Sequence, residues 1–435
     1  MSTHRLPDGP KSKVWQTVRY LRDPVGSIVD LGRRHGDLFT IPSLAGPIVV
    51  ASAPEAIRSI FAAEPDTFSP FAADGMAPVL GRGSILIQHG AAHRRARKLM
   101  QPPFHGARMR AYGTTMRDSS HAHLAATPIG RSFPVEDVFR DISLDVIIRT
   151  IFGVSTGERI DACRRGVRES IAAFGPRIAT FKSLQHEFGG WGPWAKFRRL
   201  LDGVHDLLRQ EIAVRDPARP GDDVLSLLVA ARDESGAAMD EQEIVEQLFT
   251  MVIAGHETTA TALAWAIDEL LRQPELLAQL REELRPIGVD PDRITQSPLL
   301  DAVCAETLRL HPLIPLVTRK LLRPFEVGGH LLPAGVGLGA CLLLAHLREE
   351  RYPQATEFRP QRFLAGKQPS PHEYLPFGGG ARRCLGAAFA LHEMKIVLAT
   401  VVLEFELELT SAPARTSVRA ATIGPRGGVP VVRRR

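Results

Sequence analysis

The sequence predicts a mainly α-helical protein of the α+β class, with its strands gathered toward the two ends of the chain. Helical periodicity dominates from about residue 91 to residue 320, whereas short apolar runs separated by turns occupy residues 35–70 and recur within residues 325–410. No repeat or low-complexity linker divides the 435 residues. We therefore expect one domain over residues 1–435, built either around one large core or as two closely packed lobes.

The strand predictions rest on short apolar runs. Residues 38–41 and 48–50 are apolar runs bounded by turns in the first strand-rich part. Residues 325–344 return to this pattern, with glycine and proline between the runs. Residues 404–409 alternate polar and apolar side chains with a period of two, which predicts a late strand.

The helix predictions rest on amphipathic segments with recognisable ends. Residues 141–152 carry apolar side chains at helical spacing and stop at Gly153. Residues 222–232 begin with acidic side chains, which suit the N-terminus of a helix. Residues 241–272 form one long helical pattern that is apolar at its middle and ends before Pro274.

Composition favours a globular protein of a reducing compartment. Hydrophobic residues make up 44% of the chain and charged residues 23%, which is ordinary for a soluble domain. Residues 1–10 are polar and contain two prolines, so they predict neither a signal peptide nor a membrane span. The cysteines lack the paired spacing of a disulfide framework, and we expect a cytoplasmic protein. They are Cys163, Cys304, Cys341 and Cys384.

The net charge of +6 indicates an acidic protein partner rather than nucleic acid. No aromatic side chains alternate with the basic clusters, and no nucleic-acid-binding module accompanies them. The clusters are Arg94, Arg95, Arg97 and Lys98, and Arg382 with Arg383.

A glycine-rich segment brings Cys384 to the start of an apolar helical pattern. Residues 377–386 read Phe-Gly-Gly-Gly-Ala-Arg-Arg-Cys-Leu-Gly. Positive charge and helix-end amides lower the pKa of a thiol, so we expect a thiolate that can ligate iron. The glycines allow the backbone to pass close to a large flat cofactor. The alternative is a structural cysteine buried in a turn.

Polar residues interrupt the long apolar helix at residues 254–259, Ala-Gly-His-Glu-Thr-Thr. A glycine inside a helix costs about 1 kcal/mol relative to alanine, and an unsatisfied acid or hydroxyl among apolar neighbours is costly. One interpretation is structural: a small residue for close helix packing, with threonines bonding back to carbonyls. The other is an opening in the helix that holds a water and a proton path beside a cofactor.

Two further sets of charged residues have meaningful spacing. Glu306 and Arg309 lie one turn apart among apolar neighbours, which predicts a buried pair that must be fully hydrogen-bonded. Arg362 lies in residues 358–363 and offers a second arginine. His93 and Arg97 are four residues apart and therefore share one face of a helix.

These segments resemble the cytochrome P450 family. The haem-binding pattern of that family, Phe-x-x-Gly-x-Arg-x-Cys-x-Gly, is met at Phe377, Gly380, Arg382, Cys384 and Gly386. Residues 254–259 are similar to its oxygen-binding motif at every position. The resemblance implies the P450 fold, a helical haem domain with small sheets, and haem b (iron protoporphyrin IX) held by the Cys384 thiolate.

The resemblance also implies roles on the long helix and beside the cysteine segment. Thr258 would steady dioxygen and a water, and Glu257 would relay protons. His256 occupies the variable position of the motif, so we expect it to face away and to have no role. The Glu-x-x-Arg and Pro-x-Arg-Phe motifs of the family would lock the meander before the cysteine, a structural triad of Glu306, Arg309 and Arg362.

By the same resemblance, His93, Arg97 and Arg319 are candidate ligands of the haem propionates. The implied reaction is monooxygenation, such as hydroxylation: one oxygen atom of O2 enters a C–H or C=C bond and the other leaves as water. Nothing in the chain resembles a flavin or iron–sulfur module, so electrons would come from a separate ferredoxin and reductase. The expected ferredoxin-docking face is Arg94, Arg95, Lys98 and Arg383.

The expected substrate pocket is apolar, and Arg177 or Lys182 could hold a carboxylate. An apolar small molecule with at most one polar end is implied. Residues 100–109 and the Cys384 segment resemble a bacterial group of the family that acts on fatty acids and terpenoids. This resemblance implies terpenoids or fatty acids of secondary metabolism before steroids and polyketides. Two alternatives are a haem-thiolate isomerase or dehydratase that needs no electrons, and a non-catalytic haem or lipid binder. The pocket residues are Met76, Val79, Leu80, Ile85, Phe174, Met251, Ala254, Leu313, Ile314 and Leu316.

Overall fold

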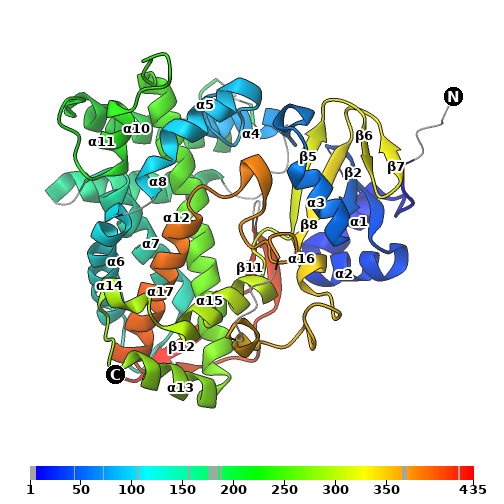
Figure 1. Ribbon diagram of the computed structural model, residues 1–435. Coiled ribbons are helices and arrows are strands. Elements are labelled where there is room, and N and C mark those ends of the chain that lie inside the picture. Colours follow the sequence, from blue (N-terminus) through cyan, green and yellow to red (C-terminus); the bar gives the residue numbers. More distant parts are fainter. Residues whose placement is uncertain are drawn as a thin grey trace.

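The computed structural model describes residues 6–435, except 44, 72, 105–106, 155–156, 175–177, 179–184, 187–188, 365–369 and 420–421. Helices form one side of the molecule and the largest sheet lies on the other (Figure 1). This is the mainly α arrangement that the sequence predicts.

In chain order the α-helices are α1 (Lys13–Arg22), α2 (Pro24–His35), α3 (Pro54–Ala62), α4 (Ala73–Leu80), α5 (Gly90–Met100), α6 (Ala107–Ala125), α7 (Val135–Thr150), α8 (Gly157–Phe174), α10 (Pro193–Ala213), α11 (Val224–Ala230), α12 (Glu241–Leu271), α13 (Pro274–Leu284), α14 (Pro291–Ile294), α15 (Pro298–Leu310), α16 (Leu342–His346) and α17 (Ala387–Glu404). Short 3-10 helices are η1 (Pro65–Thr67), η2 (Pro102–Phe104), η4 (Pro360–Phe363) and η5 (Gly380–Arg382).

The strands are β1 (Leu38–Ser43), β2 (Gly46–Ala51), β3 (Phe68–Pro70), β4 (Ser132–Pro134), β5 (Leu316–Leu321), β6 (Phe325–Val327), β7 (His330–Leu332), β8 (Gly337–Cys341), β9 (Leu407–Leu409), β10 (Thr416–Arg419), β11 (Thr422–Pro425) and β12 (Pro430–Arg433).

The largest sheet joins the N-terminal strands to strands from the later half of the chain. Its order is β1-β2-β8-β5-β3, with β2 and β8 parallel and the other pairs antiparallel. Val50 lies opposite Gly339 in the parallel pair. The smaller sheets are β4-β12-β9, β10-β11 and β6-β7. The sheet therefore fixes β5, and the Arg319 that it carries, against the N-terminal part of the chain.

Helix α12 runs through the helical body and contacts α7, α10, α15 and α17. The side chain of Asp240 begins it by accepting a hydrogen bond from the Glu243 N–H at 2.7 Å. A Cβ on Gly255 would lie 3.2 Å from Ile147 Cδ1 of α7, tighter than most such contacts. Glycine therefore lets these two helices approach closely at the centre of the body.

Several element predictions need correction. Within residues 35–70, which were expected to be strands, Pro54–Ala62 forms α3, because proline at its first turn and buried Ile57 and Ile60 favour a helix. At the other end, α17 continues through Glu404, so the late strand is only Leu407–Leu409. The long helix and the strands β1 and β2 are confirmed. The extent of a single domain over residues 1–435 stays a prediction.

In the described part of the chain, no helix combines the length and the apolar character that crossing a membrane requires.

Candidate active site

The segment before Cys384 turns tightly against α3. Gly378 and Gly380 adopt φ values of 67° and 66°, in the left-handed region that favours glycine. A Cβ on Gly380 would lie 2.4 Å from the carbonyl oxygen of Phe61, so no side chain fits there. The Cys384 N–H donates to the Phe377 carbonyl at 3.0 Å and closes the loop. This loop ends at α17 and leaves Cys384 unpaired and exposed.

The charge balance at Cys384 differs from the expectation. The Gly386 N–H, Arg383 and Arg97 lower the pKa of the thiol, as predicted, but burial of the sulfur among surrounding protein atoms raises it more. The side chain keeps an exposed surface, so the protein encloses the sulfur without covering it. The predicted lowering of the thiol pKa is therefore wrong for the protein alone. A metal cation at the exposed sulfur would supply the missing stabilisation of a thiolate.

Four basic side chains converge beside this loop from three elements. His93 and Arg97 come from α5, Arg319 from β5 and Arg382 from η5. Each of these arginines influences the pKa of His93, which burial, their three positive charges and that of Arg94 lower to about 4. His93 is 4% exposed, and its ring makes no hydrogen bond with a described residue.

The three arginines lack an anionic partner among the described residues. Arg319 donates to the Gly379 carbonyl at 3.1 Å, and Arg382 donates to the carbonyls of Ile85 and Gln88. Burial lowers the pKa values of Arg319 and Arg382 to about 10 each, with a smaller contribution from the positive charge of Arg382 on Arg319 and of Arg97 on Arg382. Grouped cations with no carboxylate to offset them fit a ligand that brings its own negative charges. The two propionates of haem satisfy this requirement, so the residues present fit that cofactor.

In residues 254–259 of α12, the structure agrees with the structural interpretation for Thr258, in which the threonine bonds back to a carbonyl of its own helix. The Thr258 hydroxyl donates to the Ala254 carbonyl at 2.8 Å, and α12 is helical throughout. The expected opening in the helix is therefore wrong for this structure, because the hydroxyl bonds back to its own helix. Ala254, one turn before Thr258, is exposed in the middle of an otherwise buried helix. Ala254 and Thr258 thus share one accessible face.

The neighbours of Thr258 separate onto different sides of α12. His256 is 7% exposed, and its Nδ1 lies 3.2 Å from the Val252 carbonyl oxygen of the same helix. Burial lowers its pKa to about 4. It lies about 200° around the helix from Ala254, so it faces away as expected. Glu257 is half-buried and makes no ion pair with a described residue.

The buried ion pair is present and holds the meander before Cys384. Arg309 Nε lies 2.6 Å from Glu306 Oε2, and both side chains are 0% exposed. Arg362 Nε donates to Glu306 Oε1 at 2.9 Å, as does the Arg359 N–H. Arg309 also donates to the carbonyls of His346 and Ala355, both at 2.8 Å. Every group of this network has partners, which a buried ion pair requires.

His346 is a positioning residue that the sequence analysis missed. Its Nδ1 lies 3.1 Å from the Arg309 carbonyl oxygen, and its Nε2 lies 2.9 Å from the Leu375 N–H, two residues before Phe377. Burial lowers the pKa of His346 to about 3, so the ring is neutral and donates through Nδ1. It therefore ties α15 to the start of the cysteine loop. Its position after a short apolar run gave no signal in the sequence.

Residues 81–88, which follow α4, are clasped by polar side chains of α12. Gln247 accepts from the Ile85 N–H at 2.9 Å and donates to the Gly83 carbonyl at 2.5 Å. Thr250 donates to the Ser84 hydroxyl at 2.7 Å. Gln247 is 0% exposed, and the sequence analysis also missed it. A buried glutamine in an apolar helix pattern is the signal that would have found it.

The predicted pocket residues range from buried to exposed. Met76, Ile85, Phe174 and Leu313 are half-buried and pack on the core of the helical body. Ile314 is 43% exposed, Met251 is 9% exposed, and Ala254 is exposed. The proposed carboxylate-binding residues Arg177 and Lys182 lie outside the described residues.

Two predicted pocket residues are buried in the protein core, and a third, Leu316, is half-buried against the sheet. Val79 and Leu80 are each 2% exposed and belong to the core of the helical body. Leu316 packs in the sheet, with its Cδ1 2.7 Å from where a Cβ on Gly339 would stand. The next strand residue, Val317, lies on the opposite face and approaches Gly378 of the cysteine loop. Val317 therefore replaces Leu316 as the candidate wall residue.

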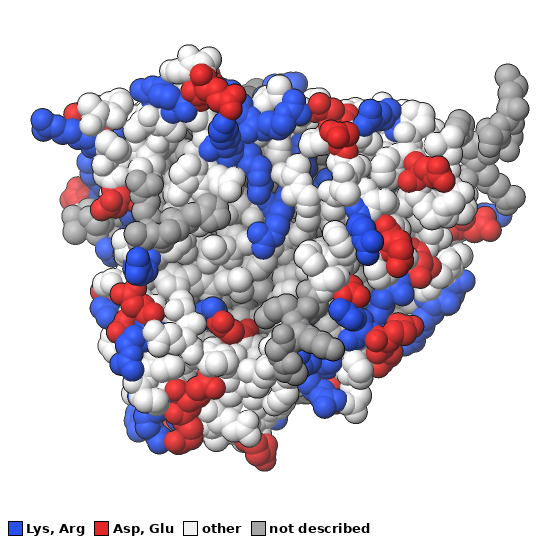
Figure 2. All heavy atoms as spheres, viewed as in Figure 1, with Lys and Arg blue, Asp and Glu red and all other residues white. Residues whose placement is uncertain are grey.

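The basic docking face is largely neutralised by carboxylates. Arg95 pairs with Asp233 at 2.6 Å and with Glu243 at 3.1 Å. Arg94 lies 3.0 Å from Asp66, and Lys98 pairs with Glu234. Figure 2 shows basic side chains over α5 and toward the centre of the face that carries the cysteine loop, with acidic ones among them. The exposed Arg383 has no ion pair with a described residue.

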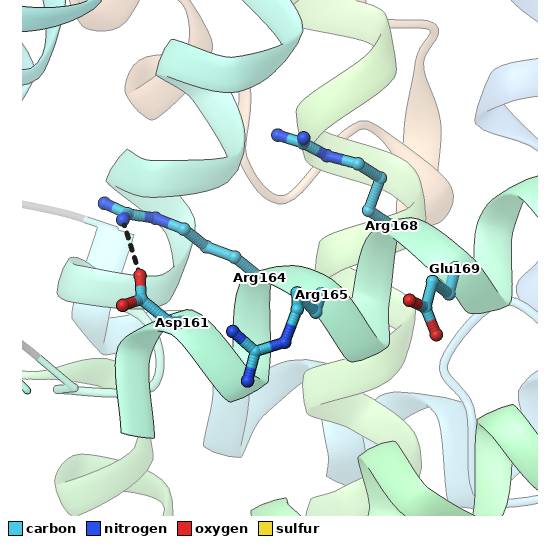
Figure 3. Close-up of a pocket in the computed structure, with 5 residues that line it drawn as sticks. All are labelled: Asp161, Arg164, Arg165, Arg168 and Glu169. Atoms are coloured by element: carbon cyan, nitrogen blue, oxygen red, sulfur yellow. Dashed lines mark hydrogen bonds and ion pairs between the residues drawn. The ribbon is translucent and has the colours of Figure 1, made fainter. Parts of the chain in front are cut away.

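A separate surface pocket lies along α8 and has no part in this site. All of its lining residues come from that one helix. Arg164 pairs with Asp145 and Asp161, and Arg168 pairs with Asp141. Arg165 makes no ion pair with a described residue. Figure 3 shows these residues, Asp161, Arg164, Arg165, Arg168 and Glu169.

Comparison with known proteins gives one family. The sequence profile of the family described as Cytochrome P450 matches residues 7–422. Cytochrome P450 135B1 of Mycobacterium tuberculosis is 38% identical over 419 residues, covering 94% of this chain and 87% of that protein. Cytochrome P450 138 of the same species is 34% identical, covering 99% and 97%.

Solved structures share the fold. A structure titled retinoic acid bound cyanobacterial CYP120A1 superposes with a TM-score of 0.86 at 23% identity, covering 99% of both chains. The haem domain of cytochrome P450DA gives a TM-score of 0.85 at 22% identity, covering 99% of this chain and 97% of that one.

Proposed function

Because the chain belongs to the cytochrome P450 family, whose members are haem-thiolate monooxygenases, we propose that it oxygenates an apolar small molecule, with Cys384 as the thiolate ligand of haem b. One observation carries the residue assignment. The exposed thiol of Cys384 lies beside three arginines that lack carboxylate partners among the described residues. An iron porphyrin with two propionates satisfies both features at once.

When bound, haem supplies the activation of O2, and the protein supplies ligand, protons and an apolar surface. Arg97, Arg319 and Arg382 would bind the propionates, and the neutral His93 ring would donate a hydrogen bond to one of them. Gly386 leaves open space where a Cβ would stand, with no described atom within 4 Å.

Thr258 and Glu257 would handle protons on the face of α12 that carries Ala254. The Thr258 hydroxyl donates to the Ala254 carbonyl at 2.8 Å and accepts no hydrogen bond from a described residue. It can therefore accept a hydrogen bond from a water while it stays oriented by its own helix. The half-buried carboxylate of Glu257 makes no ion pair within the described chain, so it is free to exchange protons with solvent.

An apolar substrate is supported by uncharged side chains of the expected pocket and by Val317 beside them in the sequence. Ile85, Leu313, Ile314 and Val317 are half-buried or exposed, and none of them carries a charge. Terpenoids and fatty acids are the classes we propose, and secondary metabolism is the proposed context. The four cysteines are unpaired, which supports the cytoplasmic location expected from the sequence.

Electrons would come from a ferredoxin-type donor on the face that carries the cysteine loop. The paired charges of Arg94, Arg95 and Lys98 contribute less there than predicted, so Arg383 becomes the leading candidate for the contact. Complementary charge at such a contact mainly sets the rate of encounter.

The first test is an absorption titration of the ferric protein. Fatty acids, sesquiterpenes, steroids, macrolides and retinoic acid are added in turn while the Soret band is recorded. We expect a terpenoid or fatty acid to shift the band to shorter wavelength by displacing water from iron. A band that never moves contradicts the proposed substrate class. Product formation without any reductant would instead support the isomerase alternative.

The second test replaces the ligand itself. Cys384→Ser should abolish thiolate ligation, and the reduced carbonyl complex should lose the band that thiolate ligation produces. Cys163→Ser changes a buried cysteine of α8 and serves as the control that keeps this band. An unaltered carbonyl spectrum in the Cys384 variant would refute the assignment.

A further inference from the structure

Helix α1 turns four large apolar side chains toward solvent, whereas Tyr20 is partly buried against the core. Gln16 faces the protein instead and is 4% exposed. This burial pattern is the reverse of an ordinary surface helix, which buries its apolar side and exposes its polar side. The exposed fractions are 73% for Val14, 63% for Trp15, 49% for Val18 and 54% for Leu21.

The exposed apolar side chains form one face. At about 100° per residue, Leu21, Val14 and Val18 lie within about 60° of one another, and Trp15 borders them. Exposed apolar side chains scattered singly are common, but a contiguous group with a tryptophan indicates an interaction surface.

Basic side chains surround this face without local partners. Lys11, Lys13 and Arg22 are exposed, and none of them forms an ion pair with a described residue. The nearby carboxylates are already engaged. Asp23 caps α2 by accepting from the Gly26 N–H at 2.9 Å, and Asp30 lies 2.7 Å from Arg19.

The helix is fixed to the body and does not need a partner in order to fold. Ser12 caps it by accepting from the Trp15 N–H at 3.2 Å, and α1 packs on α2, β1 and β10. Figure 1 places α1 on the sheet side of the molecule, away from the C-terminus.

We propose that α1 docks this protein on an anionic lipid bilayer, lying flat with the face of Val14, Trp15, Val18 and Leu21 in the headgroup region. Aliphatic side chains enter the boundary with the acyl chains, and tryptophan is favoured at that level. The three unpaired cations face anionic lipids, which attract them at short range. A protein partner would need no such combination of tryptophan and cations on a single short helix. The proposal is independent of the monooxygenase activity.

The test is sedimentation of the full-length holoprotein with vesicles of phosphatidylcholine, with and without phosphatidylglycerol. We expect binding to the anionic vesicles that weakens at high salt. The double variant Trp15→Ser and Val18→Ser should lower the partition coefficient by about tenfold. Lys11→Gln with Lys13→Gln should reduce both the binding and its salt dependence.

Ile129→Ser is the matched control, because Ile129 is also exposed, at 62%, and forms a bridge with Arg433 near the C-terminus. It should bind vesicles like the unchanged protein. All changed side chains are exposed, and an unaltered haem spectrum and melting temperature confirm that each variant folds. Absence of binding to anionic vesicles would overturn the proposal. A dimer in solution that the Trp15 and Val18 changes abolish would also overturn it, by assigning the face to a second copy.

Discussion

At Thr258 one hydroxyl has two possible partners, the Ala254 carbonyl of its own helix and a water on the accessible face. The structure shows the first, at 2.8 Å. A hydroxyl donates one proton but keeps lone pairs that accept, so both interactions are compatible. The back-bonded geometry therefore orients the acceptor side of Thr258 toward the face shared with Ala254.

Thr258→Val should separate substrate binding from productive oxygenation. The methyl group keeps the shape of the side chain but removes the hydroxyl. We expect an unchanged substrate-induced Soret shift. We expect at least a tenfold lower yield of product per electron consumed, because the hydroxyl that accepts a hydrogen bond from a water and supports proton delivery is lost. Product and NADPH consumption measured together give this ratio.

Thr259→Val is the control for that experiment. Thr259 is the next residue, 4% exposed, and the same change there removes a hydroxyl from the buried side of α12. It should leave the yield per electron unchanged. Equal yields from both variants would remove Thr258 from the mechanism.

Among the elements, the segment of residues 81–88 connects both halves of the candidate site. Gln247 holds its backbone from α12, and Arg382 of the cysteine loop donates to the carbonyls of Ile85 and Gln88. Glu246 lies so close to Gly81 that a Cβ there would be 2.0 Å from the carboxyl carbon. The Glu246 side chain could move aside, but Gly81 has a φ of 82°, in the left-handed region that favours glycine. The segment thus forms a wall beside α12.

Gln247→Leu should loosen this wall. The Gly83 carbonyl and the Ile85 N–H would lose their partners, so we expect a loss of about 1–3 kcal/mol in the free energy of unfolding. Hydrogen exchange at Ile85 should accelerate, and the affinity for apolar ligands should fall. Gln296→Leu makes the same change on an exposed side chain and should have none of these effects. Unchanged exchange at Ile85 would show that the segment is held by other contacts.

At the scale of the whole molecule, one buried acid makes stability depend on pH. Glu393 of α17 is 1% exposed, and its Oε1 has no hydrogen-bond partner among the described residues. Burial raises its pKa from 4.5 to about 7, and the nearby Ser143 hydroxyl of α7 opposes the shift. The folded pKa exceeds the unfolded one, so the contribution to stability is complete below about pH 4.5 and is lost as the pH rises to about 7.

Glu393→Gln should remove this dependence. The difference in unfolding free energy between the variant and the unchanged protein should shift in favour of the variant by up to about 3 kcal/mol as the pH rises from about 4.5 to about 8. Denaturant unfolding at both pH values measures the difference. Glu406→Gln neutralises an exposed carboxylate just beyond α17 and should show no such gain. A difference that does not change with pH would mean that the pKa of Glu393 is the same in the folded and the unfolded protein, against this prediction.

The electron-donor contact is also a property of the whole surface. Arg383→Gln should slow reduction by a ferredoxin by about fivefold at low salt, and the effect should shrink at high salt, because screening weakens encounter forces. Arg165→Gln removes the same charge from α8 and should change the rate little (Figure 3). Stopped-flow reduction measures both. Equal rates for the two variants would place the docking contact elsewhere.

The sequence by itself determined the family, the candidate iron ligand and the order of most of the main elements. Cys384, Thr258, Glu306 and Arg309 lie in short motifs whose chemistry and spacing can be read locally, and the structure places the last two in a fully buried pair. The long helix was predictable from its apolar periodicity and from Pro274. These properties depend on residue type and on neighbours within a few positions.

Only the tertiary structure decided how distant residues share space. It paired Arg95 with Asp233, enclosed Cys384 enough to raise its pKa, and turned Leu316 inward while Val317 approaches the cysteine loop. It also brought Gln247 into hydrogen-bond contact with Gly83, 164 residues away in the sequence. Burial, ion pairing and the facing of a strand depend on which elements pack together, and no short window of sequence contains that information.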